Sequence, residues 1–196
     1  MKNLFLAASF ADVYLDFAQH IHLPLTGKSV TFIPTASQPE HVTFYVEDGK
    51  KAFEKLGIQV EVLNIDEQDY ETIEATLNRN DFIFVSGGNT FYLLQELRRS
   101  HADKIITRLI NQGKLYIGSS AGSIVLGPDL EYIKTMDDPS KAPDLLDTQA
   151  LGIVNFSILP HFKEQPFSDI TLQIFNKFCA EQVLVPLSNK QFVYIN

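Results

Sequence analysis

Short, mostly apolar runs alternate with amphipathic stretches through the first 120 residues of the chain. The five apolar runs are Leu4–Ala8, Val30–Ile33, Val60–Leu63, Phe82–Val85 and Leu115–Ile117. Strands that are apolar along most of their length are typical of a parallel sheet that is buried on both faces. The stretches between them repeat apolar residues at helical spacing, as Phe10, Val13 and Phe17 do. The pattern predicts an α/β fold with a three-layer, doubly wound and mostly parallel sheet.

The regular alternation ends after residue 120. Four later segments have the composition of short strands, namely Tyr132–Thr135, Phe156–Leu159, Val183–Pro186 and Phe192–Ile195. Residues 136–152 form an acidic stretch interrupted by prolines, which predicts a long loop. Residues 168–179 repeat apolar positions as a helix does. Cys179 falls on the apolar side of that helix, so we expect it in the core.

Composition narrows the class of protein. A chain of 196 residues, 45% of them apolar, is long enough for one domain, 1–196, with a full hydrophobic core. The formal net charge is −8 without a Lys/Arg cluster, which argues against a nucleic-acid partner. The single cysteine excludes an internal disulfide and fits a reducing compartment. The N-terminal apolar run stops at Ser9, and no stretch has transmembrane length, so we expect a cytoplasmic protein without a membrane partner.

One candidate for chemistry follows the fifth apolar run. The segment Gly118–Gly122 reads G-S-S-A-G and matches the pattern G-x-S-x-G. A nucleophile on a sharp turn after a central strand needs small neighbours, because other backbone passes close by. Ser120 would be the nucleophile, and the N–H of Ala121 would face a developing oxyanion. The alternative is a Gly/Ser turn without chemistry.

A second glycine-bearing loop, Ser86–Thr90, follows the run Phe82–Val85 directly. Paired glycines before a helix can bring backbone N–H groups against an anion. The alternative is a tight turn in which Asn89 or Thr90 caps the next helix. The loop lacks the G-x-G-x-x-G spacing of a dinucleotide site.

A serine nucleophile needs a base, and the base needs a third group that orients it. His161 ends the predicted strand Phe156–Leu159, which we expect at the same sheet edge as Ser120. Asp137 and Asp138 follow the predicted strand Tyr132–Thr135, and they give the order Ser, Asp, His of other α/β serine hydrolases. An acidic turn is the alternative for this pair, and the other acidic candidates are Asp129, Asp144 and Asp147.

The motifs G-G-N-T-F at 87–91, Y-I-G-S-S-A-G at 116–122 and P-H-F at 160–162 resemble those of the S51 serine peptidases. That family contains aspartyl dipeptidase and cyanophycinase. The resemblance implies a fold like that of the class I glutamine amidotransferases. It implies Ser120 as nucleophile, His161 as general base and acid, and Asp138 as the orienting carboxylate, with Asp137 as the alternative. Gly88 and Ala121 would form the oxyanion hole.

The resemblance also implies a substrate. It would be a short peptide, cleaved without metal or organic cofactor, and the dipeptidases prefer an N-terminal aspartate. We expect Asn89, Thr90 and Lys134 to bind substrate, Lys134 in place of a family arginine. Ser119 stands where the dipeptidase typically has tryptophan, which leaves open an amidase or esterase on another acyl group, or a non-catalytic binding protein. The sequence also leaves open whether the chain forms a homodimer.

Overall fold

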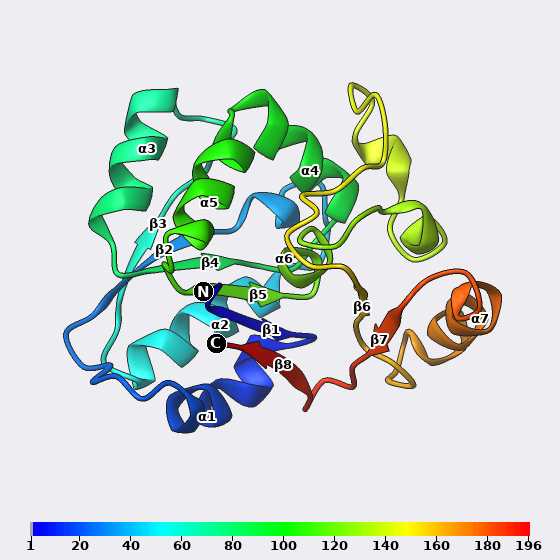
Figure 1. Ribbon diagram of the computed structural model, residues 1–196, viewed down its shortest axis with the longest axis horizontal. Helices are drawn as coiled ribbons and strands as arrows, with labels where there is room; N and C mark the ends of the chain where they lie inside the picture. The colour runs from blue at the N-terminus through cyan, green and yellow to red at the C-terminus, as the bar shows by residue number, and fades with distance from the viewer. Residues whose placement is uncertain (1) are drawn as a thin grey trace.

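Six strands form the central sheet of the computed structural model, which describes residues 2–196 (Figure 1). The strand order is β3-β2-β4-β5-β1-β8. Their bounds are β1 (Leu4–Ala7), β2 (Ser29–Ile33), β3 (Gln59–Val62), β4 (Phe82–Val85), β5 (Tyr116–Ser119) and β8 (Phe192–Ile195). The first five strands run parallel, and β8 pairs antiparallel with β1. The expected mostly parallel sheet is confirmed.

Helices cover both faces of this sheet (Figure 1). On one face lie α1 (Phe10–His20) and α2 (Phe44–Lys55), and on the other α3 (Tyr70–Arg79), α4 (Thr90–Arg99) and α5 (Ala102–Asn111). The core beneath α1 and α2 is rich in phenylalanine, with Phe10 stacked on Phe53 at 4.4 Å between ring centroids. The opposite core is mainly aliphatic. No helix within residues 2–196 has the length and apolarity needed to cross a membrane.

The second half of the chain departs from the sequence expectation. Tyr132–Thr135 is not a strand, because Glu131–Ile133 forms one 3-10 turn, η2, that buries the neighbouring side chains of Tyr132 and Ile133 together. The Tyr132 hydroxyl donates to the carbonyl of Ile158 at 2.5 Å. Consecutive inward side chains are incompatible with the alternation of a strand.

The strand before His161 does not join the central sheet. β6 (Ser157–Leu159) pairs in parallel with β7 (Leu184–Pro186) as a separate two-stranded sheet beside α7 (Ser168–Phe178) (Figure 1). The expectation of one shared sheet edge for Ser120 and His161 was therefore wrong. Cys179 is exposed just after α7, so its expected place in the core was also wrong.

Backbone contacts at two glycines determine how the chain leaves β5. A Cβ on Gly122 would lie 2.1 Å from the carbonyl oxygen of Val85 in β4, and one on Gly118 would lie 2.7 Å from the carbonyl oxygen of Gly122. The buried Tyr116 hydroxyl donates to that same Gly122 carbonyl at 2.6 Å. The short helix α6 (Ala121–Ile124) thus starts in direct backbone contact with β4.

We expect Gly122→Ala to destabilise the protein by about 3 kcal/mol or more, because its methyl group overlaps backbone that cannot move aside. Gly49→Ala is the matched control. Gly49 lies in α2, where a Cβ would meet Phe32 ring atoms at 3.5 Å, an ordinary contact, and a glycine-to-alanine change within a helix gains up to about 1 kcal/mol. Urea unfolding of both variants measures the difference. Equal stabilities would show that the turn is free to shift.

Candidate active site

Ser120 occupies a strained turn between β5 and α6. Its φ of 49° and ψ of −111° lie outside the regions that a serine ordinarily adopts. Its N–H donates to the carbonyl of Ala7 at 3.0 Å, and its carbonyl accepts from the N–H groups of Ser123 and Ile124. Such strain costs on the order of 1–3 kcal/mol and persists where surrounding hydrogen bonds enforce it, often at functional sites.

His161 places its imidazole against this turn. Its Nε2 lies 3.1 Å from Ser120 Oγ. The residue follows β6 with a φ of 56°, and the next N–H, that of Phe162, donates to the carbonyl of Leu187 after β7. The Phe167 ring stacks on the imidazole with centroids 5.2 Å apart. The small sheet and this aromatic contact hold the ring in place.

Asn189 lies on the other side of the imidazole. Its Oδ1 is 2.6 Å from His161 Nδ1. An amide oxygen only accepts hydrogen bonds, so Nδ1 carries the proton and Nε2 presents a lone pair to Ser120 Oγ. Within residues 2–196, no carboxylate hydrogen-bonds to His161.

Burial lowers the pKa of His161 below its ordinary value of 6.5. The hydrogen bond that Nδ1 donates to Asn189 and the charges of Glu164 and Asp12 oppose this shift, and burial outweighs them. The imidazole is therefore neutral at neutral pH, the form that can accept a proton from a hydroxyl.

The Ser86–Thr90 loop after β4 lies beside Ser120. A Cβ on Gly87 would lie 3.3 Å from Ser120 Cβ, and Gly88 has a φ of 134° and lies against the carbonyl of Ala36. The N–H of Asn89 donates to that carbonyl at 2.8 Å. Among the described residues, the N–H groups of Gly88 and Ala121 donate to no acceptor. They remain available to a bound group.

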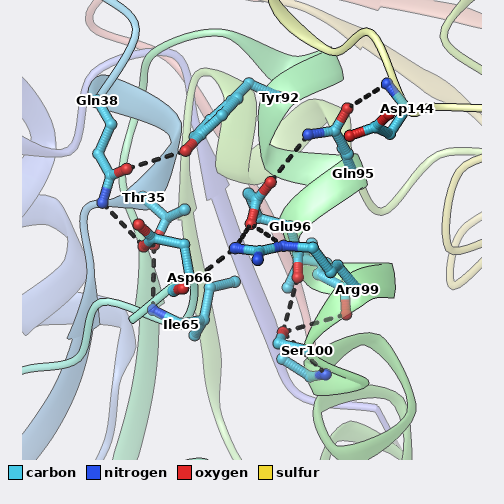
Figure 2. Close-up of polar contacts among 12 residues, drawn as sticks. Thr35, Gln38, Ile65, Asp66, Tyr92, Gln95, Glu96, Arg99, Ser100 and Asp144 are labelled. Atoms are coloured by element: carbon cyan, nitrogen blue, oxygen red, sulfur yellow. Dashed lines mark hydrogen bonds and ion pairs between the residues drawn. The ribbon is translucent and has the colours of Figure 1, made fainter. Parts of the chain in front are cut away.

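A polar network fixes the loop against which Gly88 lies (Figure 2). Tyr92 of α4 donates to Gln38 Oε1 at 2.9 Å, and Gln38 Nε2 donates to Asp66 Oδ1 at 2.8 Å. Arg99, at the far end of α4, donates to the Asp66 carbonyl at 3.1 Å and also binds the buried carboxylate of Glu96. The loops after β2 and β3 are thus tied to α4, which begins at the glycine loop.

Comparison with known proteins identifies the family of this fold and site. A sequence model of peptidase family S51 matches residues 6–196. The chain belongs to peptidase family S51.

Its relatives are named as peptidases. An uncharacterized peptidase of Listeria monocytogenes is 50% identical over 195 residues, covering 100% of this chain and 95% of the relative. A peptidase E of Haemophilus influenzae is 30% identical, covering 83% of this chain and 74% of the relative. The crystal structure of a candidate peptidase E protein from Listeria monocytogenes superimposes with a TM-score of 0.94 at 51% identity, covering 100% of this chain and 94% of that chain. The S51 chain is a peptidase, and its fold is consistent with the class I glutamine amidotransferase-like architecture.

The structure does not bring the expected carboxylates of this S51 chain to His161. Asp138 is exposed and accepts from the N–H of Ser140 at 2.9 Å. Asp137 Oδ2 accepts from the N–H of Thr90 at 2.9 Å and from its hydroxyl at 2.5 Å. Because residues 132–135 form no strand, this acidic segment packs on the N-terminus of α4. Asn189 takes the place beside Nδ1 that we expected Asp138 to fill.

The three expected substrate-binding residues lie in different settings. Asn89 is the N-cap of α4. Its Oδ1 accepts from the N–H of Tyr92, and its Nδ2 donates to the carbonyl of Asp138. Thr90 binds Asp137. The exposed Lys134 lies 2.5 Å from Glu131. Asn89 and Thr90 thus follow the glycine loop directly, whereas the ammonium of Lys134 is held by a surface carboxylate.

Burial raises the pKa of Asp137 to about 6 from its ordinary 3.8, against the two Thr90 hydrogen bonds and with help from the charge of Glu40. The folded chain therefore binds a proton in a pH range where the unfolded chain has released it. The contribution of Asp137 to the free energy of unfolding is therefore most favourable below the pKa of the unfolded chain, and it is lost as the pH rises through the pKa of the folded chain. Asp137 thus carries an energetic cost at neutral pH.

We expect Asp137→Asn to raise the free energy of unfolding by about 2 kcal/mol near pH 7.5 and by much less near pH 4. Urea titrations at the two pH values measure the change. Asp144→Asn, an exposed residue of the same loop, removes an equal charge and serves as control. A less stable Asp137→Asn protein near pH 7.5 would mean that the Thr90 contacts outweigh the cost of burial.

Proposed function

We propose that this S51 peptidase is a serine peptidase in which Ser120 is the nucleophile, His161 the base and Asn189 the orienting group. The observation that carries the proposal is a strained serine whose Oγ lies 3.1 Å from the Nε2 of a neutral, half-buried imidazole. A hydroxyl is activated as a nucleophile when it is hydrogen-bonded to a base and the base is hydrogen-bonded to a group that orients it.

In the first half-reaction, His161 Nε2 takes the proton of Ser120 Oγ as the oxygen attacks the peptide carbonyl carbon. The carbonyl oxygen becomes an oxyanion, and the N–H groups of Gly88 and Ala121 donate to it. Nε2 then gives its proton to the leaving amine, the C–N bond breaks and an acyl-enzyme forms. Water repeats the sequence to release the acid. These groups fill every role, so the proposal includes no metal ion or organic cofactor.

A neutral amide as the third member changes the electrostatics of this reaction. Asn189 holds the tautomer with the proton on Nδ1, but it adds no negative charge to stabilise an imidazolium. The base therefore stays weak and ready to accept a proton at a pH where a carboxylate-paired histidine would already be protonated. We propose that activity extends well into the acidic range.

We propose short peptides as substrates, with an N-terminal aspartate preferred. The resemblance of the motifs to those of the aspartyl dipeptidases supports this preference, and the relatives named peptidase E support a peptide substrate. A chain of net charge −8 does not attract an acidic side chain through its overall field, so recognition has to be local. Lys134 is the cation we propose, and it would exchange Glu131 for the substrate carboxylate. Asn89 and Thr90 hold the segment that follows Lys134, because Asn89 donates to the Asp138 carbonyl and Thr90 donates to the Asp137 carboxylate.

We expect Ser120→Ala to abolish hydrolysis and fluorophosphonate labelling while the fold persists. His161→Ala should lose a similar factor, and the double variant little more, because the members act as a unit. The neighbouring Ser119→Ala is the control, since Ser119 Oγ instead accepts from the N–H of Phe10 at the start of α1 at 3.1 Å. It should lower stability by about 1 kcal/mol and keep activity. Loss of labelling in Ser119→Ala alone would place the nucleophile there.

The pH profile of kcat/KM tests the third member. We expect Asn189→Ala to lower kcat/KM on the order of 100-fold, and Asp138→Asn to stay near wild type. In wild type the acid limb should fall below the ordinary histidine value of 6.5, because burial lowers the pKa of His161. Asn189→Asp adds a negative charge beside the imidazole, raises that pKa and moves the limb to higher pH. A collapse in Asp138→Asn with an active Asn189→Ala would return the role to Asp138.

A further inference from the structure

The Asp137 carboxylate has one oxygen that the proposed mechanism does not use. Oδ2 is anchored by the N–H and hydroxyl of Thr90, whereas Oδ1 makes no hydrogen bond within the described residues. No lysine or arginine in residues 2–196 forms an ion pair with this carboxylate. A half-buried carboxylate without a cation is costly, and a bound cation would offset that cost.

Tyr45, in the first turn of α2, brings a second free polar atom to the same place. Its hydroxyl is buried and has no hydrogen-bond partner in the described part of the chain. A Cβ on Gly87 would lie 3.6 Å from the Tyr45 ring and 3.3 Å from Ser120 Cβ, so the tyrosine lies beside the nucleophile turn. Burial and the charges of Glu40 and Asp137 raise the pKa of Tyr45 to about 12, so the hydroxyl stays protonated and within the field of Asp137.

We propose that Asp137 Oδ1 and the Tyr45 hydroxyl form a subsite for the α-ammonium group of the substrate's N-terminal residue. This inference rests on the proposed function, because it places the scissile carbonyl at Ser120. The α-ammonium nitrogen is two bonds, about 2.5 Å, from the carbonyl carbon of its own residue. The groups that bind the ammonium must therefore lie next to Ser120. Asp137 meets this requirement, because Thr90, which anchors it, is only two residues beyond Gly88.

The subsite predicts which bond is cut. A free ammonium held by Asp137 admits the first residue only, so cleavage is confined to the first peptide bond. An acylated N-terminus keeps a single N–H and carries no charge, so it cannot bond to both groups and leaves the carboxylate without a cation, which disfavours that substrate. Glu40, exposed on the preceding loop, adds negative potential for the ammonium without a direct contact being required.

Two substrates that differ only in the amine test the proposal. Aspartyl p-nitroanilide and succinyl p-nitroanilide share the same acyl chain, with and without the α-ammonium. We expect Asp137→Asn and Tyr45→Phe to lower kcat/KM for the aspartyl compound by about 100-fold and about 10-fold, mainly through KM, and to leave the succinyl compound unchanged. Asp144→Asn should change neither. Equal losses on both compounds, or no loss on either, would overturn the subsite.

Binding to the Ser120→Ala protein separates this proposal from the hydrolytic one. By calorimetry, we expect Asp-Leu to bind about 10- to 100-fold more tightly than N-acetyl-Asp-Leu, and Asp137→Asn in the same background to remove the difference. Equal affinity for the two peptides, or binding of neither, would refute the subsite even if Ser120 labels normally. A wild-type protein that discriminates in binding but fails to label at Ser120 would refute the serine peptidase and leave the subsite standing.

Discussion

The close approach of the backbone at Gly122 to the carbonyl of Val85 is the constraint on which the site depends. Because α6 starts against β4, β5 has to end abruptly, and Ser120 takes the strained conformation that bridges strand and helix. The same approach brings the loop after β4 beside the loop after β5. The Ser120 hydroxyl and the N–H groups of Gly88 and Ala121 therefore share one edge of the sheet, where doubly wound folds place their ligands.

The imidazole comes from a separate structural unit. β6 and β7 run parallel, with Leu159 paired to Pro186, so the residues that follow the two strands emerge together. His161 and Asn189 are those residues, and their mutual hydrogen bond is a consequence of this pairing. The contact between His161 and Ser120 thus requires the small sheet to be docked against the central one. Changes in that docking should affect activity before they affect the stability of the central sheet.

Sequence patterns predicted those parts of the candidate site that lie within one continuous segment of the chain. The run of apolar residues followed by G-x-S-x-G located Ser120, and the same reasoning located the Gly87–Gly88 loop, because strand, turn and helix follow one another along the chain. Asn189 was not predicted, because its contact with His161 depends on β6 pairing with β7, and periodicity does not reveal a contact between distant segments. A polar residue just after the predicted strand Val183–Pro186 was the available signal. Asp137 and Asp138 were candidates because residues 132–135 have strand composition, yet tertiary packing buries Tyr132 and Ile133 side by side.

Charge is distributed unusually around Ser120. The imidazole of His161 contacts a neutral amide, while the carboxylate of Asp137 is bound by Thr90 at the start of α4. A crystal structure of the fluorophosphonate adduct tests this arrangement most directly. The account predicts phosphorus bonded to Ser120 Oγ, its oxygen within hydrogen-bond distance of the N–H groups of Gly88 and Ala121, and Asn189 Oδ1 still on His161 Nδ1. Phosphorus on another side chain, or a carboxylate in place of Asn189 at Nδ1, would contradict it.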